Sequence, residues 1–188
     1  PPWAASTPVP EKPVPEKPAL RNMSTLLEHL PALLDDDPSV ATVLGRRTAS
    51  LAVAEPARAV VLASLVRRTG RAPLVVAVPT GTEAERLAND LRLFLGDPPS
   101  GSGSVELFPA WETLPFERIS PGVETMGRRL RVLHRLASID DRPLVVVASG
   151  RALVQRLGPG AGRIDPIRIG PGDTVDQQAL IADLVDVG

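Results

Sequence analysis

The amino-acid sequence predicts an α/β protein, in which a mostly parallel sheet has helices on both faces and follows a proline-rich tail. Two short apolar runs, at 74–78 and 144–148, are typical of strands buried on both faces. Segments with helical periodicity lie between and around these runs. Because such an alternation of strands and helices builds right-handed crossovers, it predicts a parallel sheet.

The first 22 residues are predicted to be a disordered linker. Seven prolines occur in the first twenty residues, and Val-Pro-Glu-Lys-Pro appears at 9–13 and again at 14–18. Such a segment cannot bury a core, so we expect an extended, polyproline-like spacer. Recognition by an SH3-type domain is the alternative. Residues 23–188 are long enough for one ordinary domain and are expected to form a single α/β subdomain.

Composition narrows the functional classes. The chain has no cysteine and only two histidines, so neither disulfides nor thiolate metal sites form, and no metal or other cofactor is expected. No apolar run is long enough to span a membrane and no signal peptide is evident, which predicts a cytoplasmic protein without membrane contact. A net charge of −1 does not indicate a nucleic-acid binder.

Three helices and one strand are expected before the first apolar run. Asp37 and Pro38 favour the start of a helix, and the acidic run 35–37 is interpreted as a loop and cap rather than a metal site. Pro56 suits the first turn of a helix that ends at Gly70. The helices are predicted at 24–34, 38–44 and 56–69, and the strand at 48–53.

A capping box at 82–85 predicts the start of the next helix, which Gly96 closes. One face of this helix is expected to be apolar, with Ala84, Leu87, Leu91 and Phe94 or Leu95. A Pro/Gly/Ser loop at 97–104 and a strand at 105–108 follow.

Ser120 and Pro121 are predicted to cap and begin a further helix. Its apolar side is expected to comprise Val123, Met126, Leu130, Leu133 and Ala137. On the opposite side we expect Arg128, Arg131 and Arg135. These arginines could contact a DNA backbone, but a solvated helix face is the simpler interpretation. After the strand at 144–148 come a helix to Leu157, a weaker strand at 164–169 and a helix at 175–186.

Ligands of parallel sheets usually bind at the carboxyl ends of the strands, so the turn after the strand at 48–53 is the first candidate site. A phosphate loop would read G-x-x-x-x-G-K-[ST] there. Ala52 and Ala57 stand at the two glycine positions. Arg58 stands at the lysine and Ala59 at the Ser/Thr position.

Each of these changes weakens phosphate binding. Alanine lacks the backbone freedom of glycine, and Ala59 has no hydroxyl for Mg²⁺. Pro56 removes an N–H donor from the cradle, and Glu55 adds negative charge where phosphates would lie. Only Arg58 could still meet an anion. We therefore interpret the turn as an ordinary strand–helix connection that does not bind nucleotide.

The segment 108–121 concentrates aromatic residues and prolines. Pro109 and Pro115 prevent a regular helix or central strand, so Phe108, Trp111 and Phe116 must pack on the body or meet a partner. Packing is the favoured interpretation. Stacking on nucleic acid or an interface hot spot is the alternative.

This segment resembles the W-E-T-L-P-[YFH]-[ED]-x-x-S-P signature of transcription-repair coupling factors. The matching residues are Trp111, Glu112, Thr113, Leu114, Pro115, Phe116, Glu117, Arg118, Ser120 and Pro121. The segments 74–94, 122–130 and 144–157 are similar to the family as well, so the resemblance extends over about residues 24–188.

The resemblance implies a UvrB-like N-terminal module, of which this chain would be the first subdomain, Rossmann-like or P-loop-NTPase-like with a decayed phosphate loop. In that family a following subdomain recruits UvrA. Further domains contact RNA polymerase and drive ATP-dependent translocation on double-stranded DNA. Residues 1–188 contain neither the family's G-E-[FY]-x-x-R-G-G stretch nor a motor motif. The family's UvrA recruitment and ATPase activity are therefore not assigned to these residues.

Three functional hypotheses follow. The chain is expected to be a non-catalytic scaffolding or regulatory part of a repair-coupling factor that displaces stalled polymerase and recruits excision repair. The alternatives are a stand-alone α/β nucleotide-binding enzyme and a DNA-binding module that acts through arginines. A parallel sheet that lacks its last elements should also leave an open edge, so we expect the isolated chain to be prone to aggregation or to need a partner.

Overall fold

The computed structural model describes residues 26–97, 103–113, 122–157, 167 and 169–187. The proline-rich tail therefore lies outside the described residues. Three parallel strands form the sheet: β1 (Leu74–Val78), β2 (Val105–Phe108) and β3 (Val145–Ser149), in the order β1-β3-β2. Val145 of β3 lies opposite Leu74 of β1 and opposite Val105 of β2. The predicted α/β class with a parallel sheet is confirmed.

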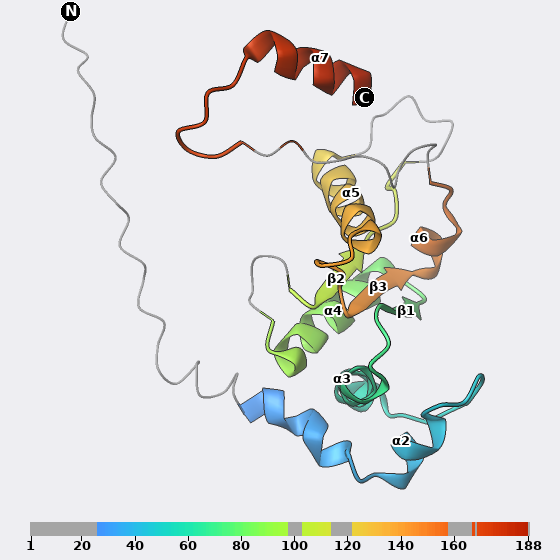
Figure 1. Cartoon of the computed structure of the whole chain (residues 1–188). Helices are drawn as coiled ribbons and strands as arrows, with labels where there is room; N and C mark the ends of the chain where they lie inside the picture. The colour runs from blue at the N-terminus through green and yellow to red at the C-terminus, as the bar shows by residue number, and fades with distance from the viewer. Residues whose placement is uncertain (1–25, 98–102, 114–121, 158–166, 168, 188) are drawn as a thin grey trace, which may run out of the picture.

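Helices cover both faces of this sheet (Figure 1). The chain passes from β1 to β2 through α4 (Gly81–Leu95) and returns from β2 to the central β3 through α5 (Val123–Ala137). Since the two crossovers run in opposite directions, right-handed connections place their helices on opposite faces. The α4 helix therefore packs on one face of β3, and α5 packs on the other.

Two apolar clusters follow from this layering. On one face, Val145 and Val147 of β3 pack with α4 and with α3 (Arg58–Thr69). On the other face, Val146 and Ala148 pack with α5 and α6 (Gly150–Val154). Each of these four β3 residues is at most 4% exposed, as expected for a central parallel strand. The last helix, α7 (Gln177–Val187), lies apart from these layers (Figure 1).

Single residues in the sequence mark where the helices before the sheet begin and end. Residues 26–29 are helical and continue into η1 (Leu30–Leu34), and α2 (Pro38–Val43) follows. The Asp37 carboxylate caps α2 by accepting from the backbone N–H groups of Ser39 and Val40, at 2.7 and 3.2 Å. The hydrogen bonds from Val40 and Ser39 lower the pKa of Asp37. The helix at 38–44 and the capping role of Asp37 are confirmed.

The helix predicted at 56–69 is also confirmed. Its first turn is η2 (Glu55–Ala57), which leads directly into α3. Gly70 ends α3 with a φ of 57°, a left-handed conformation that glycine adopts without a steric penalty.

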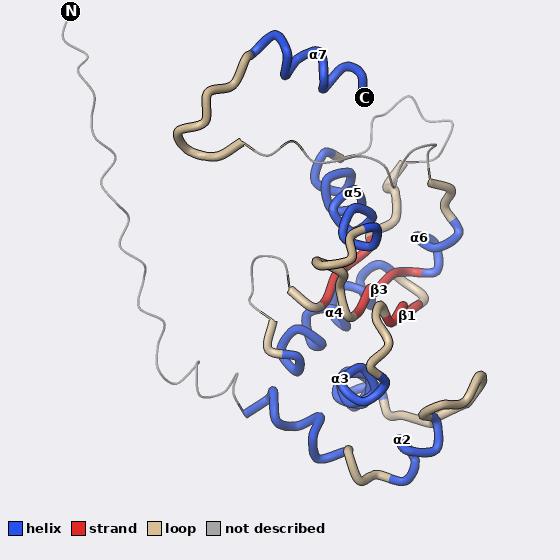
Figure 2. The backbone as a smooth tube through the Cα atoms, in the orientation of Figure 1, coloured by secondary structure: helices blue, strands red, loops and turns tan. Residues whose placement is uncertain are grey.

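One predicted strand is wrong, and a second is largely untested. Residues 48–53 form no strand, and Figure 2 shows this stretch as a loop that leads to α3. Residues 167 and 169 are not in a strand either, and the rest of the segment 164–169 lies outside the described residues. Both segments have the residue types of a strand, but a strand also needs a neighbour with which to pair its backbone. No described strand pairs with the backbone of 48–53, although Leu51 and Val53 lie close to β1.

The start of α4 differs from the prediction by two residues. Thr80, not Thr82, is the N-cap, because its backbone is extended and its Oγ1 accepts from the N–H of Glu83 at 3.2 Å. The predicted apolar face is confirmed, since Ala84, Leu87 and Leu91 are buried. Gly96 ends the helix at a φ of 74°, as predicted.

The α5 helix differs from the prediction in its start and in its orientation. It begins at Val123 with Gly122 at the N-cap position, whereas Ser120 and Pro121 lie outside the described residues. The side predicted to be buried is so only in part. Val123 is 83% and Met126 37% exposed and Ala137 is exposed, whereas Leu130 is half-buried and Leu133 packs against the apolar cluster. The residues that face the sheet are Thr125, Arg129, Val132 and Arg135.

A buried carboxylate explains this orientation. Glu106 lies in the middle of β2 and is only 2% exposed. Arg135 donates to it at 2.7 Å and Arg131 at 3.2 Å. Arg135 is itself 5% exposed and also donates to the carbonyl of Gly103 and to Asp141. Because a buried charge must be paired, this pairing turns the side of α5 that carries Arg135 toward the sheet.

We expect Arg135→Met to lower the free energy of unfolding by about 3 kcal/mol, because it leaves Glu106 buried with only the partly exposed Arg131 as a partner. Arg128→Met is the matched control on the same helix. Its pair with Glu124 is exposed, so we expect a loss of at most about 0.5 kcal/mol. Urea unfolding would measure both values, and equal losses would contradict the role given to Glu106.

Candidate functional site

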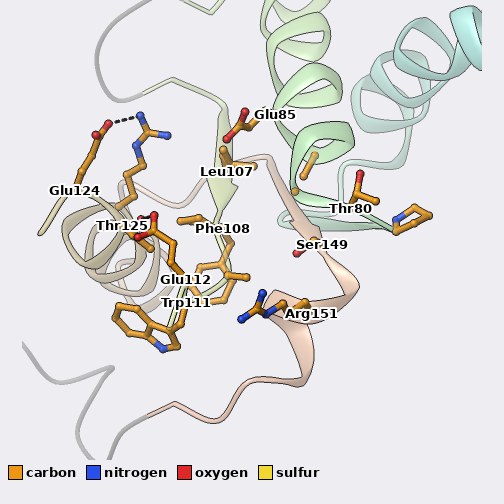
Figure 3. Close-up of a pocket in the computed structure, with 16 residues that line it drawn as sticks. Thr80, Glu85, Leu107, Phe108, Trp111, Glu112, Glu124, Thr125, Ser149 and Arg151 are labelled. Carbon is orange, nitrogen blue, oxygen red and sulfur yellow. Dashed lines mark hydrogen bonds and ion pairs between the residues drawn. The ribbon is translucent and has the colours of Figure 1, made fainter. Parts of the chain in front are cut away.

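A cleft of about 550 Å³ lies where the carboxyl ends of the three strands meet (Figure 3). Thr80 follows β1 in this cleft, Phe108 and Trp111 come from the end of β2 and the turn after it, and Ser149 and Arg151 come from the end of β3 and the start of α6. The helices after β1 and β2 leave on opposite faces of the sheet. Open parallel sheets usually bind ligands at such a point.

The wall formed by the turn after β2 depends on a buried arginine. The guanidinium carbon of Arg129 lies 4.2 Å from the ring centre of Phe108 and 4.5 Å from that of Trp111. Its Nη1 also donates to the carbonyl of Pro109 at 2.6 Å. A cation between two aromatic faces is stabilised by both rings, and the planar guanidinium is well suited to this stacking. Arg129 therefore fixes the course of the chain from Phe108 to Trp111.

Arg129 is only 1% exposed, and this burial lowers its pKa. The group remains a cation at neutral pH, since an arginine does not lose its proton in proteins. Within the described part of the chain, its Nε and Nη2 atoms have no hydrogen-bond partner. The two aromatic rings and the carbonyl of Pro109 are thus the interactions that offset its loss of water.

Two further side chains hold the same turn. Gln155, just after α6, accepts from the backbone N–H of Trp111 at 2.7 Å and donates to the Trp111 carbonyl at 3.3 Å. Thr125 of α5 donates to the carboxylate of Glu112 at 2.7 Å. The aromatic residues Phe108 and Trp111 pack on the body, as the favoured interpretation expects. Phe116 and the rest of the signature from Leu114 to Pro121 lie outside the described residues.

The charges around the cleft are mixed. Arg128 pairs with Glu124, and Glu112 accepts from Thr125. Figure 3 shows Arg151 and Glu124 on different sides of the cleft. Among the described residues that line it, no nucleophile is paired with a histidine, and no group of three potential metal ligands occurs in the described part of the chain.

The phosphate-loop-like turn lies elsewhere. Because residues 48–53 are unpaired, Ala52–Ala59 does not follow a strand of the sheet, which corrects the placement predicted from the sequence. Arg58, the one group there that could meet an anion, donates to Glu83 at 3.0 Å. Together with the first turn of α4, the turn lines a separate hollow of about 480 Å³. The acidic side chain of Glu83 thus occupies the contact that a phosphate would need.

The arginine stripe of α5 is engaged within the molecule. Arg128 pairs with Glu124, while Arg131 and Arg135 pair with Glu106. Arg135 is too deeply buried to reach a phosphate, so the prediction that all three lie on a solvated face is wrong. Sequence reasoning also missed Arg129 and Gln155. Glu106, the one charged residue in the otherwise apolar run Val105–Phe108, could have indicated the buried ion pairs.

Comparison with known proteins agrees with the signature found in the sequence. No model of a known protein family matches the chain. The transcription-repair-coupling factors of Mycobacterium tuberculosis (strain CDC 1551 / Oshkosh) and Mycobacterium bovis are each 42% identical to it over 149 residues, or 76% of the chain. That of Myxococcus xanthus is 35% identical over 150 residues, or 77% of the chain. The homologues of this chain are therefore transcription-repair-coupling factors.

The chain spans only about a tenth of the length of these curated relatives, 11% for the mycobacterial proteins and 12% for the one from Myxococcus xanthus. The likeness to transcription-repair-coupling factors thus concerns one segment of much longer proteins. It covers about three quarters of this chain, well beyond the signature between Trp111 and Pro121.

We expect Arg129→Ala to release Trp111 from the wall of the cleft. In a Trp3→Phe background, Trp111 is the single tryptophan, so its emission should shift to longer wavelength and acrylamide should quench it more strongly. The free energy of unfolding should fall by about 3 kcal/mol, because a large buried side chain is lost. Arg151→Ala, an exposed change at the same cleft, is the control and should leave the emission unchanged and cost at most about 0.5 kcal/mol. An unchanged spectrum for Arg129→Ala would contradict this role.

Proposed function

We propose that residues 23–188 are a non-catalytic scaffolding or regulatory subdomain in the N-terminal part of a transcription-repair-coupling factor, preceded by a proline-rich disordered linker at 1–22. The observation that carries the proposal is the sequence identity to such factors over three quarters of the chain. The three-layer α/β arrangement and the signature at 111–121 support it, since both are expected of the UvrB-like module of that family.

The assignment as non-catalytic rests on chemistry. Ala59 offers no hydroxyl to a magnesium ion, and Pro56 offers no N–H to a phosphate. The carboxylate of Glu83 already engages Arg58. The larger cleft at the ends of the strands has mixed charge, and no nucleophile–histidine pair occurs among the described residues that line it. Neither hollow therefore supports nucleotide hydrolysis, and no cofactor is proposed.

The partners follow from the proposed place in the factor. The rest of the same protein would supply a UvrA-binding subdomain, an RNA-polymerase-interacting domain and a motor that moves on double-stranded DNA. The whole factor would displace stalled polymerase and recruit excision repair in the cytoplasm. Among the described residues, no helix is long and apolar enough to cross a bilayer.

The two alternatives have less support. A stand-alone nucleotide-binding enzyme would need an intact phosphate cradle, which residues 52–59 do not provide. A DNA-binding module that uses Arg128, Arg131 and Arg135 would have to break their ion pairs with Glu124 and Glu106, and Arg135 is buried.

We expect no heat of binding when the 188-residue chain is titrated with millimolar ATP and Mg²⁺ in a calorimeter. The physical reason is the missing glycines, hydroxyl and N–H donor at residues 52–59. An intact P-loop ATPase under the same conditions serves as the positive control. Magnesium-dependent binding to this chain would overturn its assignment as non-catalytic.

The proposed role of the protein in DNA repair can be tested in the source organism. We expect deletion of the gene to bring repair of the transcribed strand after ultraviolet irradiation down to the slower rate of the non-transcribed strand. Strand-specific measurement of lesion removal is the readout, and complementation with the intact gene is the control. A deletion strain that still repairs the transcribed strand faster would overturn the proposed function.

A further inference from the structure

Three arginines line one pocket beside the start of β1. Arg46 lies in the loop after α2, Arg68 in the last turn of α3, and Arg71 in the loop between α3 and β1. The pocket has a volume of about 410 Å³, and we call it the arginine pocket. Leu74, the first residue of β1, lines it as well, whereas the cleft with the aromatic wall lies beyond the other end of this strand.

The charges of the arginine pocket are not compensated. None of its three arginines has an ion-pair partner in the described part of the chain, whereas Arg135 and Arg131 of α5 pair with Glu106. The Nη1 atom of Arg68 is buried and has no hydrogen-bond partner among the described residues. A buried N–H group without a partner costs free energy, and an incoming carboxylate would remove that cost.

The dipole of α3 accounts for only part of this cluster. A cation in the last turn of a helix is favoured by the free carbonyl groups there, and this explains Arg68. It does not explain Arg46 or Arg71, because both lie outside the helix. Their convergence with Arg68 on one pocket indicates a negatively charged ligand.

The floor of the arginine pocket is apolar and partly exposed. It is formed by Val43, Leu44, Leu62, Leu65 and Leu74. The volume of the pocket lies within the range of about 300–1,000 Å³ that is typical of ligand sites. A phosphate backbone has no apolar group that would cover this floor. A protein segment can place an apolar side chain on it and carboxylates beside the arginines, so the lining favours an acidic peptide over DNA.

We propose that the arginine pocket binds an acidic segment of a partner protein, with an apolar side chain on its floor and flanking carboxylates on Arg46, Arg68 and Arg71. The planar guanidinium groups can each hold a carboxylate through two hydrogen bonds, which supplies specificity. Burial of the apolar side chain supplies affinity. Because this binding follows from the residues of the pocket, it goes beyond the proposed function and does not depend on it.

Selection of displayed peptides on the full-length protein that contains this chain tests the proposal. Random short peptides on phage would be selected in parallel on the native protein and on a double variant, Arg46→Glu with Arg71→Glu. Both side chains are exposed, so the variant should fold while the charge at the pocket is reversed. We expect the peptides that bind only the native protein to carry an apolar residue between aspartates or glutamates. If no peptide separates the two proteins, or if those that do are not acidic, the proposal is overturned.

The affinity of a selected peptide for the full-length protein gives the second measurement. Fluorescence polarisation of the labelled peptide should show binding at least about tenfold weaker to the pocket variant, because charge-assisted contacts are lost. The control is Arg142→Glu with Arg156→Glu, which changes the net charge equally at two exposed residues outside the pocket. Its affinity should stay within about twofold of the native value. Equal weakening in both double variants would show an effect of bulk charge and overturn the proposal.

Competition separates a peptide from a nucleic acid. A peptide in which serine replaces the apolar residue should bind at least about tenfold more weakly, because the floor of the pocket is then uncovered. Double-stranded DNA should not displace the labelled peptide. Displacement by DNA that disappears in the pocket variant would identify a phosphate backbone as the ligand and overturn the peptide proposal. None of these measurements involves the repair assay, so a failure here is distinguishable from a failure of the proposed function.

Discussion

The ion pair between Glu106 and Arg135 is the interaction on which the rest of the site depends. A carboxylate in the middle of a buried strand must be paired, and α5 supplies the arginines that reach it. The helix therefore turns Arg129 and Arg135 inward, while Val123 and Met126 remain exposed. Hydrophobic periodicity alone would have given the opposite orientation, but the cost of an unpaired buried charge exceeds the gain from burying two partly exposed apolar side chains.

The same orientation builds the wall of the cleft. Arg129 lies on the buried side of α5 together with Arg135, so its guanidinium meets Phe108 and Trp111 instead of solvent. The carbonyl of Pro109 accepts a hydrogen bond from it, and Gln155 holds the backbone of Trp111 from the other side. The family-like signature thus starts in a turn that α5 and α6 fix in place.

In the phosphate-loop-like turn at 52–59, the chemistry of the residues and the position of the turn have different origins. Its weakness as a nucleotide site follows from Ala59 and Pro56 wherever the turn lies, because a missing hydroxyl and a missing N–H are properties of the residues themselves. Its position does depend on the sheet. Without a paired strand at 48–53, the turn lies beside the first turn of α4, where Glu83 takes the contact of Arg58.

The sequence by itself determined the three strands, the helices that connect them, the caps at Asp37, Gly70 and Gly96, and the likeness to coupling factors. These depend on short apolar runs, on backbone conformations that a single residue type favours, and on a contiguous motif, all of which are local. Only the tertiary structure decided which side of α5 is buried and whether 48–53 is a strand. Both depend on partners that are far away in the chain. The buried side of α5 depends on the charge of Glu106 beneath it, and a strand at 48–53 would depend on a neighbouring strand that pairs with its backbone.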